Sequence, residues 1–256
     1  MVMEEVAIMI LVLSLILFLL LVTINKKRGF KAFCSLYINL FFIILVVNLI
    51  TWGLNPIIAA LIFSLGTSAF ILFFINGVNK KTKIAYLSVV SVILMMSLFI
   101  IFFVIDSNMY GFVRQHASFL FAFSQNISIN YVHVTIAVQI MLLTAAITNT
   151  ALDISTALNE VCEKNPQIKP KELIKSAKNI ASDVLGTMIN TLFFIFIADF
   201  MGFIFFYNRL GFAYWINHKL LIQGVSSLLL VAIGCILIIP LVIIIQSHVF
   251  TKKKLM

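Results

Sequence analysis

Residues 6–25 read VAIMILVLSLILFLLLVTIN and are followed at once by Lys26, Lys27 and Arg28. A helix rises 1.5 Å per residue, so twenty such residues extend about 30 Å, the thickness of a bilayer's hydrocarbon core. Glu4 and Glu5 precede the run, and no small-residue cleavage site follows it. These flanks are typical of a retained membrane span and not of a signal peptide that is removed.

Six further apolar runs of similar length follow, near residues 33–52, 57–76, 84–105, 131–153, 184–207 and 221–246. The 256-residue chain is 62% hydrophobic and 11% charged, with a mean hydropathy of +1.15. A soluble domain carries about 25% charged residues. The alternating polarity of a β-barrel is absent from these runs. The sequence therefore predicts an all-α, polytopic bundle of about seven transmembrane helices in a lipid bilayer.

The basic residues indicate how this bundle is oriented. Fifteen of the eighteen Lys and Arg fall on one side of the predicted membrane, in four groups: residues 26–31, 80–83, 164–178 and 252–254. Only Arg114, Arg209 and Lys219 fall on the other side. Because the side rich in Lys and Arg is cytoplasmic, we expect the N-terminus outside and the C-terminus inside. The net charge of +9 is thus explained by topology, and no nucleic-acid partner is predicted.

A polar stripe follows the fifth run. Residues 148–160 read TNTALDISTALNE, and Asn149, Asp153, Thr156 and Glu160 are spaced by four, three and four residues. That spacing puts all four on one face of a helix. We expect this helix to continue past the inner membrane surface, so that the stripe descends from the bilayer into the cytoplasm.

A second stripe precedes the sixth run, with a turn expected between the two at Asn165-Pro166 and Lys169-Pro170. Its members recur every three or four residues: Ser176, Asn179, Asp183, Thr187 and Asn190. A helical hairpin over 151–185 would bring the stripes together, with Asp153 and Asp183 at similar depth. Two carboxylates in one dry site either share a proton or hold a cation. The alternative is structural, since polar stripes also hold membrane helices together at about 0.6 kcal/mol per hydrogen bond.

Two secondary candidates lie elsewhere. His133, with Gln139 near it, could extend a proton relay from Asp153 toward the outside, and Asp199 lies in an aromatic part of the sixth run. A contact of Asp199 with Arg209 or His218 is the simpler alternative for that acid. Residues 106–130 are aromatic and are expected to lie in the membrane interface. Cys34, Cys162 and Cys235 are far apart and predict no disulfide, and which metal a site would hold is left open.

Three segments resemble the YibE/F-like family of bacterial multi-spanning membrane proteins: ALDISTALNE (151–160), Asn165-Pro166 and NIASDVLGTMINTL (179–192). The resemblance runs from about residue 30 to 250. It implies an anchor span at 1–30, a six-helix membrane domain at 31–250 and a basic cytoplasmic tail at 251–256. It also implies the bacterial cytoplasmic membrane, and a longer membrane relative as partner, with a homo-oligomer as the other possibility.

The hairpin is also similar to the fourth and fifth spans of resistance-nodulation-division and SecD/SecF-like permeases. In those permeases intramembrane acids resemble proton carriers, and the similarity implies that role for Asp153 and Asp183. The large outer domain that handles substrate in those permeases has no counterpart in this sequence.

Together these patterns favour a subunit of a membrane transport complex, coupled to protons or cations. The alternative is a structural subunit that stabilises a partner membrane protein and transports nothing. An enzyme is not expected, because the sequence has no H-E-x-x-H, no G-x-S-x-G and no phosphate-binding glycine loop. No cofactor is predicted.

Overall fold

The computed structural model describes residues 2–108, 130–165, 168, 170–207, 211 and 217–254. Over these residues the regular structure is helical. Its elements are α1 (Val2–Thr51), α2 (Pro56–Phe70), the π-helical turn η1 (Ile71–Ile75), α3 (Lys80–Ser107), α5 (Tyr131–Lys164), α6 (Pro170–Tyr207) and α8 (Lys219–Lys254). Within the same residues, six helical segments have the length and composition needed to cross a membrane. The predicted all-α, polytopic fold is confirmed.

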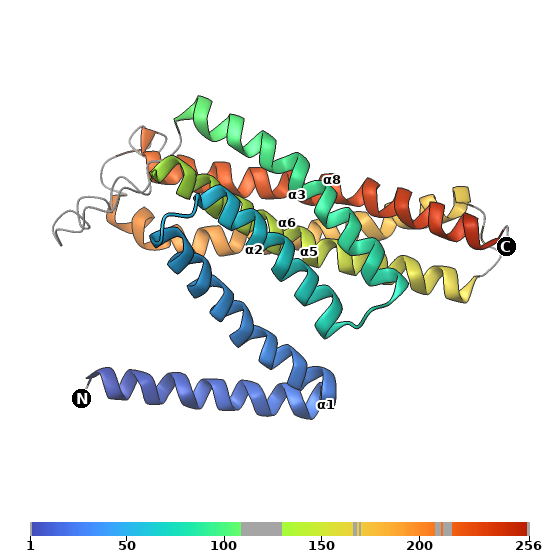
Figure 1. Cartoon of the computed structure of the whole chain (residues 1–256), viewed down its shortest axis with the longest axis horizontal. Coiled ribbons are helices and arrows are strands. Elements are labelled where there is room, and N and C mark those ends of the chain that lie inside the picture. The colour runs from blue at the N-terminus through green and yellow to red at the C-terminus, as the bar shows by residue number, and fades with distance from the viewer. Residues whose placement is uncertain are drawn as a thin grey trace.

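Helix α1 contains two of the expected spans. Its backbone leaves the helical region at Lys26 (φ 46°, ψ −121°), and the helix turns back there into a V with two long arms (Figure 1). Its membrane-like part, Ile8–Thr51, has 44 residues and would extend about 66 Å if straight, twice the bilayer core. Each arm of the V is therefore long enough for one crossing, in keeping with the seven crossings expected from the sequence. The sequence predicted a non-helical connection over residues 26–32 between the first two spans, but in the structure only Lys26 leaves the helical conformation.

A glycine permits the sharp turn of α1. A Cβ atom on Gly29 would overlap the carbonyl oxygen of Leu21, which is backbone and cannot rotate away. Above this close approach, Phe18 packs edge-on against Phe30 and Phe33, with ring centroids 6.2 and 4.9 Å apart. The arms of α1 are thus held by contacts with each other, and none of the first arm's most apolar window is buried.

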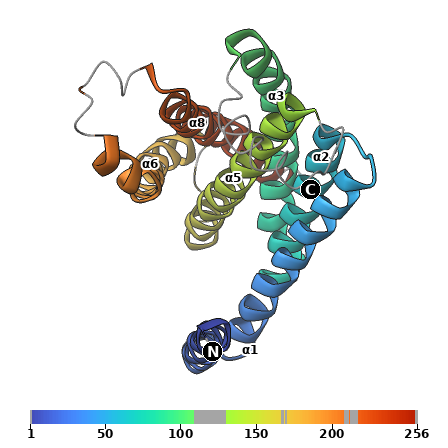
Figure 2. The same ribbon diagram turned by 90° about the vertical axis from the view of Figure 1, so that its left-hand side faces the viewer.

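Helix α5 lies at the centre of the bundle and contacts α2, α3, α6 and α8 (Figure 2). Its core face repeats every three or four residues and is fully buried at Ile136, Ile140, Leu143, Ile147 and Ile154. This periodicity is that of a helix with one apolar face against its neighbours. The arms of α1 lie outside this core, and α1 packs mainly on α2 and η1.

Proline residues stand at the start of two helices, and the predicted α5–α6 turn lies between Lys164 and Pro170. The Asn55 side chain caps α2 by accepting a hydrogen bond from the backbone N–H of Ile57 (2.9 Å), and Pro56 is the first helical residue. Helix α5 runs on to Lys164 and α6 begins at Pro170, so both arms of the expected hairpin are long and continuous. Helix α8 also continues through Lys254, which makes the described part of the basic tail helical.

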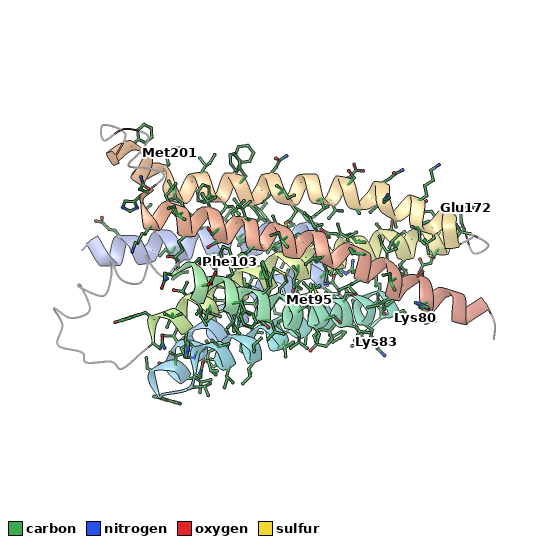
Figure 3. The ribbon with its side chains drawn as sticks, turned by 90° about the horizontal axis from the view of Figure 1, so that it is seen from above. Lys80, Lys83, Met95, Phe103, Glu172 and Met201 are labelled. Carbon is green, nitrogen blue, oxygen red and sulfur yellow. The ribbon has the colours of Figure 1, made fainter. Side chains whose placement is uncertain are left out.

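All four lysine-rich groups lie at one end of the bundle. The kink of α1, the α2–α3 connection, the α5–α6 turn and the C-terminus are found together there (Figure 1). Figure 3 shows the labelled Lys80, Lys83 and Glu172 at that end and Met201 at the other. The predicted orientation requires all four lysine-rich groups to lie at the same end of the bundle, and they do. Most of the segment expected to lie in the interface, 109–129, falls outside the described residues.

Candidate functional site: two outward stripes and an inner seam

The polar stripe on α5 faces away from the core. Asn149, Asp153 and Glu160 are exposed and Thr156 is half-buried, whereas Ile154 and Leu158 beside them are fully buried. Above Asn149 the same outward line continues with Ala145, Leu142 and Val138, which are exposed and apolar. The α5 stripe is therefore polar only in its lysine-proximal half.

The polar stripe on α6 also faces outward. Leu173, Ala177 and Ala181 form the buried face of this helix, which packs against α5 and α8. Asp183 is two residues beyond Ala181, or about 200° around the helix, and is therefore on the opposite side. The other stripe residues Asn179, Thr187 and Asn190 are exposed, while Ser176 is half-buried. Thr187 Oγ1 donates to the carbonyl oxygens of Asp183 (3.1 Å) and Val184 (2.9 Å) in its own helix.

The single chain does not join the two stripes into one buried site. Asp153 and Asp183 are both exposed, and neither side chain forms an ion pair within the described residues. Groups of three or more His, Cys, Asp or Glu that could hold a metal ion are likewise absent from that part of the chain. A shared proton or cation at these residues stays a prediction, and its geometry would need a further chain against the stripes.

A hydrogen bond of the nearby Ser155 shows how far Asp153 lies from the lysine-rich end of the bundle. Ser155 Oγ donates to the carbonyl oxygen of Lys81 (2.8 Å), in the first turn of α3 at the lysine-rich end. Asp153 lies two residues, or about 3 Å, from that level. Counted from the turn, Asp153 is about 16 Å before Lys164, and Asp183 is about 20 Å after Pro170. The two acids thus lie at similar depth, near the boundary where the lysines end.

A second set of polar contacts is buried between α5 and α8, and we call it the inner seam. Gln139 Nε2 donates to Ser227 Oγ, Thr150 Oγ1 lies 3.7 Å from Cys235 Sγ, and Gln246 Nε2 donates to the carbonyl oxygen of Ser155 (3.4 Å). From Gln139 to Ser155 this seam extends about 24 Å along α5, most of the bilayer core.

Both ends of the inner seam carry an acceptor without a donor. Gln139 Oε1 and Gln246 Oε1 are buried and accept no hydrogen bond, and Gln246 is 0% exposed. An unmet buried acceptor is costly, so we expect each of these oxygens to be satisfied by water, an ion or another donor in the membrane.

The middle of the inner seam is closed by apolar packing. Leu143 and Ile147 of α5 lie against Gly234 of α8, where an added Cβ would overlap Leu143 Cδ1 and lie 3.4 Å from Ile147 Cγ2. Both side chains are fully buried. In this conformation the seam is therefore interrupted between Gln139 and Thr150.

The secondary candidates lie apart from both stripes. His133 is half-buried in the first turn of α5, six residues before the buried Gln139. Asp199 is exposed on α6. Of the two alternative partners for Asp199, Arg209 and His218, Arg209 lies outside the described residues. Cys34, Cys162 and Cys235 are free thiols.

Sequence reasoning missed most of the inner seam. Gln246 follows the apolar run IIPLVIII, and Ser155 lies between two members of the outward stripe. Their spacing gives no sign of a partner, because the residues that meet are 91 positions apart in the chain. The one sign of a buried contact in this part of the sequence was the uncharged amide of Gln246 at the end of an apolar span.

The fold and these sites define a polytopic, all-α membrane protein with polar residues on the outward and inward faces of its central helix. The family model described as YibE/F-like protein matches residues 13–252, and the chain belongs to this family. Comparison with curated proteins and with solved structures finds no match.

Proposed function

We propose that the chain is a subunit of a membrane transport complex, coupled to protons or cations. The observation that carries this proposal is the outward placement of Asn149, Asp153 and Glu160 on α5 and of Asp183 on α6. Acidic and amide groups on a membrane helix face protein or water in preference to lipid. A partner chain against these faces would cover the stripes and complete a polar path with them.

The inner seam supports the transport part of the proposal. It extends through most of the bilayer core, and its two unmet glutamine oxygens can accept hydrogen bonds from water or coordinate a cation. Its lysine-proximal end lies within two residues of Asp153, which would exchange protons or cations with the cytoplasm. The apolar closure at Leu143, Ile147 and Gly234 then separates the two ends of the path.

A structural subunit without transport is the second candidate, and one observation favours it. Beyond Asp183 the α6 stripe continues for only about 10 Å, as far as Asn190, and is followed by the exposed Phe193 and Phe194. Such a short stripe is sufficient to bind a partner but does not cross the membrane.

The test combines assembly with ligand-dependent stability. The tagged chain is purified from its native membrane in mild detergent as wild type, Asp153→Asn, Asp183→Asn and the control Glu172→Gln, an exposed acid outside both stripes. Native electrophoresis gives the size of each assembly. Thermal unfolding is then followed across pH and across Na⁺, K⁺, Mg²⁺ and Ca²⁺. A ligand at 100 times its Kd stabilises the folded state by about 2.7 kcal/mol.

Transport is supported if a cation or a pH step shifts the unfolding midpoint of wild type and Glu172→Gln, and not that of the two Asp variants, with the assembly intact. If the Asp variants lose the partner, the stripes are an interface and the structural candidate holds. Identical responses and identical assembly in all four proteins would contradict both.

A further inference from the structure

An apolar cleft separates the second arm of α1 from α2. It has a volume of about 180 Å³ and is lined from α1 by Phe42, Val46 and Leu49 and from α2 by Ala59, Ile62 and Gly66, among others. Ile62 on its rim is 61% exposed, so the cleft is accessible from outside the bundle. At Gly66 an added Cβ would meet no atom within 4 Å, which shows that the space reaches the α2 backbone.

The cleft has the depth of one leaflet. Its lining extends on α2 as far as Thr67, eleven residues or about 16 Å from the start of the helix at Pro56. Half of a hydrocarbon core of about 30 Å is about 15 Å. Because Pro56 lies at the end opposite the lysines, the cleft belongs to the leaflet predicted to be the outer one.

The lining of the cleft has no free hydrogen-bonding group that could hold a water molecule. Its one hydroxyl, on Thr67, already donates to the carbonyl oxygens of Phe63 (2.8 Å) and Ser64 (3.4 Å). A water molecule needs two to four polar partners to be retained in a cavity. On a membrane-spanning pair of helices, hydrocarbon from the bilayer is the apolar material that surrounds the cleft.

We propose that this cleft binds one acyl chain of a glycerophospholipid from the outer leaflet, as a wedge between α1 and α2. The turn at its mouth, residues 51–56, contains Trp52, which is 81% exposed, and no Lys or Arg. An exposed Trp is suited to the headgroup level. Because this turn supplies no cation, we expect the site to select the acyl chain and not the charge of the headgroup.

The test is photolabelling of the full-length protein in nanodiscs. Two probes are used, phosphatidylethanolamine and phosphatidylglycerol, each with a diazirine on one acyl chain, and labelled peptides are mapped by mass spectrometry. We expect labelling of residues 42–67 to exceed that of Leu94 and Leu98, which are 51% and 61% exposed on α3. Both probes should give the same excess.

Gly66→Leu fills the cleft and should abolish the excess. Gly186→Leu is the matched control, because an added Cβ at Gly186 on α6 also meets no atom within 4 Å. If Gly66→Leu fails to fold, Ile62→Trp covers the rim instead and should have the same effect. The proposal is overturned if wild type shows no excess over Leu94 and Leu98, or if the filled cleft labels like wild type. Partner peptides cross-linked to residues 42–67 would also overturn it, by assigning the cleft to a protein.

Discussion

At the scale of single residues, close packing between α5 and α8 depends on Gly234. Its missing side chain leaves the space that Leu143 Cδ1 occupies. Because Leu143 is fully buried and cannot move freely, we expect Gly234→Ala to destabilise the protein by about 1–2 kcal/mol, the usual effect of overpacking. The midpoint of thermal unfolding in detergent measures this.

Gly186→Ala is the control for that substitution. The added methyl group meets no neighbour, and alanine favours a helix over glycine by up to about 1 kcal/mol. Its unfolding midpoint should be equal to wild type or higher. Equal midpoints for Gly234→Ala and wild type would show that α5 and α8 are less closely packed than described.

Gln246 carries a buried amide whose replacement by an apolar group of similar size should leave the stability of the fold nearly unchanged. Its amide oxygen has no donor, and its nitrogen makes one long hydrogen bond of 3.4 Å to a carbonyl already in a helix. We expect Gln246→Leu to change stability by less than about 1 kcal/mol, because the unmet acceptor disappears with the amide. Gln246→Ala should lower stability by about 2 kcal/mol through the cavity that it leaves.

The same thermal unfolding experiment measures both Gln246 variants. If Gln246→Leu is the less stable of the two, both groups of the amide have partners, and the inner seam ends in a structural bond. A stable Gln246→Leu protein that loses its response to cations or pH would instead assign Gln246 to transport.

At the scale of helices, the V of α1 depends on the close approach at Gly29. A methyl group there overlaps the backbone of Leu21, so one arm must move. We expect Gly29→Ala to widen the V, and the distance between spin labels on Leu11 and Phe41 to increase. Both positions are exposed, at 69% and 60%. Gly186→Ala, remote from the V, should leave that distance unchanged, and an unchanged distance in Gly29→Ala would show that the arms meet elsewhere.

The helices themselves were largely predictable from the sequence. Apolar runs of membrane length predicted the long apolar helices, and α2 begins at Asn55-Pro56 because proline and a side-chain cap act within one turn. The kink at Lys26 was not predictable in detail. The sequence has four basic residues over 26–31 and suggests a loop there, whereas Gly29 allows the second arm to begin within one residue.

The candidate site was predictable only in its periodicity. Residue spacing correctly put Asp153 on one line with Asn149 and Glu160, but the direction of that line depends on which helices pack against α5. Spacing gives no such information, and both stripes lie outward in the single chain. The inner seam was beyond sequence reasoning because each of its contacts joins residues at least 85 positions apart.

At the scale of the whole molecule, the charged end should face the cytoplasm. We expect Lys83→Cys, in a background without Cys34, Cys162 and Cys235, to react with an impermeant maleimide only after cells are permeabilised. Trp52→Cys, at the opposite end of the bundle, should react in intact cells. Both side chains are exposed, so a failure to react reports the membrane and not burial. The reverse pattern would invert the predicted orientation and place the lipid cleft in the inner leaflet.

The length of α5 has a mechanical consequence. The helix continues without a break from Tyr131 to Lys164, about 33 Å on one side of Asp153 and about 16 Å on the other. With no break at the membrane surface, the cytoplasmic end of α5 is mechanically continuous with the part packed in the bundle core. A shift of the cytoplasmic end along the helix axis would therefore be passed to the helices that pack on α5.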